Sequence, residues 1–241
     1  MSDHLGWLSV DARLQHSGAR IQNDLKTSYM VPPTQTFEQL LSDIAHPNPN
    51  IRETACALMA EHYAEQAMPK LLSLLHDPDP AIYRTAVKGL GMLGHQSLPS
   101  LLELFEATDN GTVKACCIKA LVQVSVNFPD LSFPVETINI LDKALDVPNP
   151  VVAQSALMTL GHLSKLDSEK ERVIPLLIKA CGRDNIAHVQ GAAMALAELD
   201  SPLVDDCLEN LASDESKDSL IREIAQASLE RRDSLNLRKG S

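Results

Sequence analysis

Two adjacent cysteines, Cys116 and Cys117, are the residues of this chain that most directly suggest chemistry. Cysteine thiolates bind zinc and iron and act as nucleophiles. Adjacent side chains on a helix point about 100° apart, however, and cannot bind one metal ion well. Cys117 also occupies a position at which alanine recurs elsewhere in the chain, and free cysteine packs as a small apolar residue. We therefore predict no metal site, and core packing for all five cysteines, Cys56, Cys116, Cys117, Cys181 and Cys207.

Catalytic motifs are missing from the sequence. CxxC, HExxH, GxSxG and phosphate-loop patterns do not occur, and no nucleophile, base and carboxylate stand out by their spacing. His188 replaces an aliphatic residue at a core position, where a packed, hydrogen-bonded imidazole is expected rather than a ligand. The residues thus favour a protein without catalytic side chains of its own, although enzymatic activity is left open.

A set of basic, aromatic, amide and methionine side chains suggests that the protein binds a partner rather than catalyses a reaction. If neighbouring helices stack, these side chains form a basic patch with a tyrosine beside a methionine and glutamine surface. The chain is otherwise acidic, so the patch opposes the net charge. Two interpretations are open: a solvated face, or a groove that binds the acidic surface of a partner protein. The residues are Tyr83, Arg84, Lys88, Lys114, Lys119, Gln154, Met158, Gln190 and Met194.

The helices that carry these residues are predicted from a repeat. Residues His76–His95 begin with a proline-rich turn, continue with apolar residues at helical spacing, and end at Gly94, a typical helix stop. The helical part recurs as an apolar, a small and a large apolar residue spaced four apart, starting at intervals of 31 to 39 residues. Recurrence at this period indicates a repeat protein. The triplets are Ile51/Ala55/Met59, Ile82/Ala86/Leu90, Val113/Cys117/Leu121, Val152/Ala156/Leu160, His188/Ala192/Leu196 and Ile221/Ala225/Leu229.

Each repeat is predicted to contain a helix A, a Pro/Asp/Asn turn and a helix B that carries the triplet. Six such pairs predict an all-α fold, a right-handed α-solenoid with the B helices on its concave side. The longer intervals place insertions at Val126–Phe133 and Lys165–Glu171, on one rim, where they could serve binding. We expect the solenoid to span residues 36–233, followed by a C-terminal tail (234–241). The N-terminal arm (1–35) is expected either to be poorly ordered or to dock on the first repeat or on a partner.

Composition narrows the class of protein. The net charge of −11 argues against general nucleic-acid binding, which requires a basic face. No run of residues approaches the roughly 18–20 apolar residues that span a bilayer, so membrane insertion is not expected. An odd number of cysteines without regular spacing suits a reducing compartment, and the cytoplasm is therefore the expected location.

The repeat resembles the short HEAT-like repeat of the phycobilisome lyase-type family. It stands most completely as MPKLLSLLHDPDPAIYRTAVKGLGMLG at Met68–Gly94, with weaker copies at Val151–Leu163 and Val173–Leu199. The resemblance covers about residues 36–232 and implies the solenoid fold. The family includes bilin lyase subunits, phycobilisome-degradation factors and a protein that interacts with an iron–sulfur carrier. The arginine that usually follows the first triplet residue is kept at Arg52 and Arg222 and replaced at Tyr83, Lys114, Ala153 and Val189.

Three hypotheses for the function follow. The first is a non-catalytic interaction scaffold or assembly factor that uses the concave face of the solenoid to bind a protein with an acidic surface. The second, implied by the resemblance, is a bilin lyase subunit or a chaperone for bilins or phycobiliproteins. The basic residues of the patch would suit the propionates of a bilin, which would be a handled ligand and not a resident cofactor. The third is a partner of an iron–sulfur carrier that binds no cluster itself.

Overall fold

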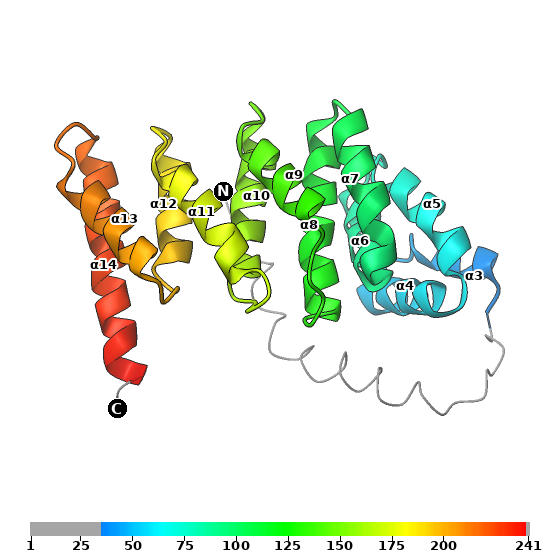
Figure 1. The fold of residues 1–241 in the computed structure, drawn as a ribbon. Helices are drawn as coiled ribbons and strands as arrows, with labels where there is room; N and C mark the ends of the chain where they lie inside the picture. The colour runs from blue at the N-terminus through cyan, green and yellow to red at the C-terminus, as the bar shows by residue number, and fades with distance from the viewer. Residues whose placement is uncertain (1–34, 240–241) are drawn as a thin grey trace.

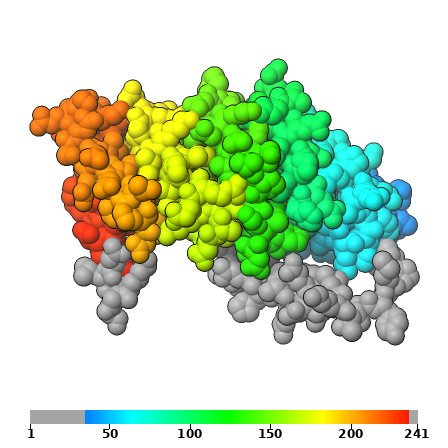
Figure 2. Space-filling model, viewed as in Figure 1, coloured from blue at the N-terminus to red at the C-terminus, as the bar shows by residue number. Residues whose placement is uncertain are grey.

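The computed structural model describes residues 35–239, which form twelve α-helices, one short 3-10 helix and no β-strand. Figure 1 shows the helices arranged as pairs that lie side by side in chain order, and Figure 2 shows the elongated body that results. The predicted α-solenoid of six helical repeats is confirmed. Apart from Gln35, the predicted N-terminal arm lies outside the described residues.

Each repeat contributes one helix A and one helix B. A 3-10 helix (Gly94–Ser97) joins the second repeat to the third. The pairs are α3 (Phe37–Asp43) with α4 (Pro49–His62), α5 (Ala64–Leu74) with α6 (Pro80–Met92), α7 (Leu98–Ala107) with α8 (Gly111–Asn127), α9 (Val135–Leu145) with α10 (Pro150–Leu163), α11 (Lys170–Cys181) with α12 (Ile186–Leu196), and α13 (Pro202–Ser213) with α14 (Ser219–Lys239).

The turn before each B helix supplies the residue that caps it. The side chain of Asn48 accepts a hydrogen bond from the backbone N–H two residues later, at 2.9 Å. Asp79 and Asn149 cap their helices in the same way, at 2.8 and 2.9 Å. A proline follows each of these three caps at the first helical position, where its missing N–H costs no hydrogen bond. The Asn-Pro and Asp-Pro pairs therefore fix where these three B helices begin.

The helices form two layers that are packed to different degrees. B helices of consecutive repeats lie closely against one another, whereas consecutive A helices touch only weakly. A stack of helix pairs curves toward the layer whose helices lie closer together, so the B helices form the concave side. At Gly91 of α6 the approach is so close that a Cβ atom would meet Gln123 of α8, lying 2.8 Å from its carbonyl carbon.

Small residues at the centre of each triplet form the core between the layers. All six central residues are at most 2% exposed, and Ala86 is completely buried. Their neighbours in the core are mainly Leu, Val and Ile from both layers. The predicted register of the repeats is therefore correct.

Cations from one repeat bind the helix ends of the repeat before it. Arg183 donates a hydrogen bond to Leu145 O at the end of α9, at 2.5 Å. Lys217 donates to Gly182 O, just after α11, at 3.1 Å. These carbonyl groups lack partners within their own helices and carry the negative end of the helix dipole.

Arg232 binds carbonyl groups at the end of α12, and its side chain is itself buried, at 5% exposed. Its guanidinium donates hydrogen bonds to Leu196 O and Leu199 O and forms an ion pair with Asp205. The sixth repeat thus binds the ends of both helices of the fifth.

The last helix runs further than expected. α14 continues to Lys239, through residues for which the sequence predicts a C-terminal tail, and no proline or glycine lies between Ser219 and Lys239. Within residues 35–239, no helix combines the length and the hydropathy that crossing a membrane requires.

Candidate functional site

The candidate site is the face of the B helices that the A helices leave uncovered, called here the B-helix face. It is built from two positions four residues apart, two and six residues after the start of each triplet, which lie on the same side of a helix. Because consecutive B helices pack side by side, the two positions form two rows across the repeats. In repeats two to five these rows hold Arg84 and Lys88, Ala115 and Lys119, Gln154 and Met158, and Gln190 and Met194.

The end of the B-helix face that belongs to repeats two and three is basic. Arg84 of α6 and Lys119 of α8 both lie close enough to Cys116 to favour its thiolate. Each of these two cations, from neighbouring repeats, therefore lies in the neighbourhood of Cys116. Lys88 is half-buried and forms an ion pair with Glu53 of the first repeat, so part of its charge is neutralised.

Lys114 serves the packing of a helix pair instead of the open face. Its ammonium group donates a hydrogen bond to Phe105 O at 2.9 Å and lies 4.5 Å from the centre of the Phe105 ring. Arg52 holds the same repeat position and donates to His46 O and Pro47 O, at 2.7 and 3.0 Å. A cation at this position binds the carbonyl end of helix A, where the helix dipole favours positive charge. Tyr83, also at this position, packs against the core.

The end of the B-helix face in repeats four and five is neutral. Met158 is 53% exposed and Met194 is 51% exposed, at equivalent positions of α10 and α12. Gln154 and Gln190 lie four residues before them, half-buried and exposed respectively. Flexible thioether side chains adapt to apolar partners, and carboxamides both donate and accept hydrogen bonds. This end of the face is suited to an apolar surface with some polar groups.

The cysteines are structural in character. Cys56, Cys116, Cys117 and Cys181 are buried, which confirms their predicted place in the core, and Cys207 is half-buried. Burial raises the pKa of Cys116 to about 11 and that of Cys117 to about 12, so both thiols stay protonated near neutral pH. No group of three or more His, Cys, Asp or Glu side chains within residues 35–239 is arranged to hold a metal ion.

The two predicted insertions pack against each other. Glu169, from the second insertion, is completely buried. Its carboxylate accepts hydrogen bonds from Phe133 N at 2.9 Å and Ser132 Oγ at 3.2 Å, both in the first insertion. Arg172 pairs with Glu169 at 2.9 Å and donates to Phe133 O at 2.7 Å. The two insertions therefore form one fixed edge of the solenoid, and sequence reasoning missed the residues that join them.

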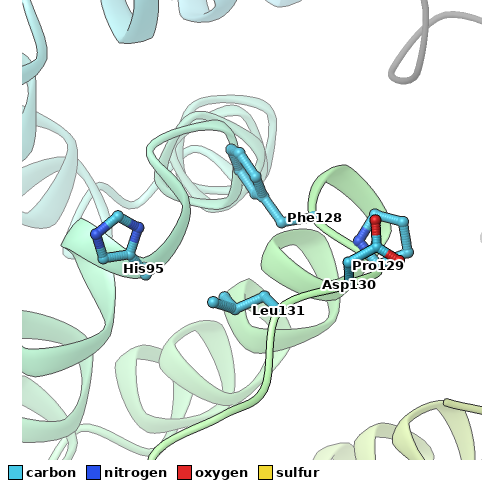
Figure 3. Close-up of a pocket in the computed structure, with 5 residues that line it drawn as sticks. All are labelled: His95, Phe128, Pro129, Asp130 and Leu131. Atoms are coloured by element: carbon cyan, nitrogen blue, oxygen red, sulfur yellow. The ribbon is translucent and has the colours of Figure 1, made fainter. Parts of the chain in front are cut away.

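A small crevice lies beside this edge. Figure 3 shows His95 and Leu131 on either side of the opening, with Phe128, Pro129 and Asp130 from the same insertion. Its volume of about 230 Å³ is below the roughly 300–1,000 Å³ typical of ligand pockets. The crevice is therefore small for a ligand site, and the B-helix face offers a larger open surface among the described residues.

Comparison with known proteins agrees with this architecture. The pattern of the HEAT repeats family matches residues 35–122 and 138–230. The chain is 62% identical over 181 residues to the "Bilin biosynthesis protein CpeZ" of Synechococcus sp. (strain WH8020), an alignment that covers 75% of this chain and 97% of the relative. It is 32% identical over 197 residues to the "Uncharacterized phycocyanin operon protein Z" of Pseudanabaena tenuis (strain PCC 7409), covering 81% of this chain and 95% of that protein.

A solved structure shares the fold. It is the complex of CpcE and CpcF of phycocyanin lyase from Nostoc sp. PCC7120, matched with a TM-score of 0.52 at 20% sequence identity. The match covers 68% of this chain and 99% of the solved chain.

Proposed function

The chain belongs to the phycobilisome lyase-type family of HEAT-repeat proteins, and we propose that it handles bilins or their acceptor proteins during bilin biosynthesis and attachment. The observation that carries this proposal is the 62% identity to CpeZ, whose name assigns that relative to bilin biosynthesis. Of the hypotheses drawn from the sequence, the bilin-handling alternative is therefore better supported than a general scaffold. The scaffold remains compatible as the means by which the protein acts.

The chemistry of the B-helix face suits its two ends to different parts of a ligand. A bilin carries two propionate groups, and guanidinium and ammonium groups bind carboxylates through charge-assisted hydrogen bonds. Arg84 and Lys119, which each lie in the neighbourhood of Cys116, would bind these carboxylates or acidic side chains of a partner protein. Met158 and Met194 would contact the apolar surface of the bilin or of the phycobiliprotein that receives it. The names of the relatives described above do not mention an iron–sulfur carrier, so they add no support to the third hypothesis.

A binding measurement with a free bilin tests this proposal. We expect the purified chain to shift and sharpen the visible absorption spectrum of a linear tetrapyrrole, because a fixed environment restricts its conformations. Arg84→Glu combined with Lys119→Glu should weaken this binding at least tenfold. The matched control, Lys70→Glu with Lys143→Glu, makes the same change in net charge on A helices and should leave it unaltered.

Co-expression with a phycobiliprotein subunit and a bilin tests whether the chain acts in the attachment of the bilin to its acceptor protein. If the chain handles the bilin, the fraction of subunit that carries covalent bilin should rise in its presence and fall with the Arg84/Lys119 variant. If the chain has no effect on this fraction and no affinity for the bilin or the subunit, the proposal is wrong.

A further inference from the structure

An apolar groove lies between two A helices at the N-terminal end of the solenoid. It has a volume of about 290 Å³ and is lined by α3 and the turn after it, by α5, and by the start of α6. Consecutive A helices touch only weakly, and between α3 and α5 a space is left open. Its aliphatic lining consists of Leu41, Ile44, Ala45, Leu74 and Ile82.

One cation lines this groove without a counter-charge. Lys70 of α5 is exposed, and its ammonium group forms no hydrogen bond or ion pair with another residue in the described range 35–239. By contrast, Lys143 and Lys179 of other A helices form ion pairs with Glu106 and Asp142. An ammonium group without a partner beside aliphatic side chains suits an occupant that is apolar and carries a carboxylate.

The chain enters the solenoid close to this groove. The side chain of Gln35 donates a hydrogen bond to Asp43 Oδ2 at 3.0 Å. The carbonyl oxygen of Gln35 accepts a hydrogen bond from the Tyr63 hydroxyl at 3.1 Å. Asp43 is the last residue of α3 and directly precedes Ile44 of the groove. These bonds hold Gln35, to which residues 1–34 are joined, near one side of the groove.

The sequence DHLGWLSVD, residues 3–11, has the matching chemistry. It lies outside the described residues and holds four large apolar side chains between two aspartates, with no lysine or arginine. Residues 12–34 join it to Gln35, and a coil of about 23 residues spans roughly 25 Å. A segment tethered at this length has an effective concentration in the millimolar range, which favours it over a free partner.

We propose that residues 3–11 bind the groove between α3 and α5, with Trp7 among its aliphatic side chains and Asp3 or Asp11 paired with Lys70. The groove lies just below the roughly 300–1,000 Å³ of ligand pockets, which suits one or two large side chains. The bound segment caps α3, a helix of only seven residues at the end of the array, where repeat proteins require a cap. This contact goes beyond the proposed function, because it involves A helices and leaves the B-helix face open.

Tryptophan fluorescence of the full chain tests the contact, because Trp7 is the only tryptophan. In the folded wild type we expect emission at a shorter wavelength than in urea, and weaker quenching by acrylamide. Lys70→Glu with Ser73→Glu, two exposed positions of the groove, should move both toward the values of the unfolded chain. The matched control, Lys143→Glu with Ser213→Glu, makes the same changes near the ends of other A helices and should behave as the wild type.

A charge swap and a cross-link identify the occupant. Asp3→Lys with Asp11→Lys, added to the Lys70→Glu and Ser73→Glu variant, should restore the emission at shorter wavelength. A carbodiimide cross-link in the wild type, mapped by mass spectrometry, should join Lys70 to Asp3 or Asp11 within a monomer.

Three results would overturn the proposal. The first is a folded wild type whose Trp7 emits as it does in urea. The second is a groove variant that keeps its helical circular dichroism and the emission of the wild type. The third is a cross-link from Lys70 that appears only in a dimer, which would make a second copy of the chain the occupant.

Discussion

Replacing Gly91 with alanine tests the close packing of the B-helix layer. A Cβ atom at this position would contact Gln123 Cβ and lie 2.8 Å from the carbonyl carbon and 3.0 Å from the Cα of the same residue. Two of these three are backbone atoms and cannot rotate away, so α6 and α8 must separate. Inserting a methyl group into a well-packed interface costs about 1–3 kcal/mol, and a fixed backbone favours the upper end. The better helix propensity of alanine offsets about 1 kcal/mol of this cost. The free energy of unfolding should therefore fall by about 2 kcal/mol.

Two other glycines of the same layer serve as matched controls. Gly161 holds the same repeat position as Gly91, but a Cβ there would meet only Ala195 Cβ, at 3.2 Å. Gly191 has more room, since the nearest atom would be Leu157 Cδ1 at 3.7 Å. We therefore expect Gly161→Ala to be nearly neutral. Gly191→Ala should stabilise the protein by up to about 1 kcal/mol, because the propensity gain meets no steric cost.

Equilibrium unfolding in urea, followed by helical circular dichroism, measures all three changes. The comparison requires a slope against urea that is the same in each variant, because a changed slope indicates partly unfolded intermediates in a repeat array. If Gly91→Ala is as stable as Gly191→Ala, α6 and α8 lie further apart than described and the reasoning from their contact is refuted.

Three further predictions concern the core, the joined insertions and the buried thiols. Ala86→Leu should lower the free energy of unfolding by about 1–3 kcal/mol, since the site is completely buried; an unchanged urea midpoint would contradict the register. Glu169→Ala should cost about 1–3 kcal/mol and speed hydrogen exchange at the Phe133 amide, which loses its acceptor; unaltered exchange there would show that the carboxylate does not hold the insertion. Burial raises the pKa of Cys117 to about 12 from an ordinary 9.0, so its stabilising contribution is complete below pH 9 and is lost as pH rises toward 12. At pH 10 the loss should be about 1 kcal/mol, and Cys117→Ala should show a correspondingly smaller fall in unfolding free energy between pH 8 and pH 10.

The fold was largely predictable because its information is local and repeated. Small residues such as Ala86 recur in every repeat where the two layers meet, and capping residues such as Asp79 recur in every turn, so each copy supports the others. The periodicity also predicted that Arg84 and Lys119 share one face, and both lie in the neighbourhood of Cys116. Such statements require only the repeat period and the geometry of a helix.

The contacts that escaped prediction are made by residues outside the triplets from which the repeat was recognised. Lys114 has the position expected for it, but its ammonium group binds Phe105 O of the preceding helix, which alignment of B helices alone does not reveal. Glu169 meets Phe133 because two insertions of unrelated sequence happen to pack together.

The binding of helix ends by the following repeat gives the solenoid a direction. Lys217 and Arg232 of the sixth repeat bind carbonyl groups at the ends of α11 and α12, so the fifth repeat lacks these partners until the sixth has folded. A nascent chain that has emerged only as far as Leu199 would present these helix ends to water. The last repeat must therefore leave the ribosome before the one that precedes it can complete its hydrogen bonds. Truncation from the C-terminus consequently uncovers helix ends of the fifth repeat, which were closed by side chains that are synthesised after them.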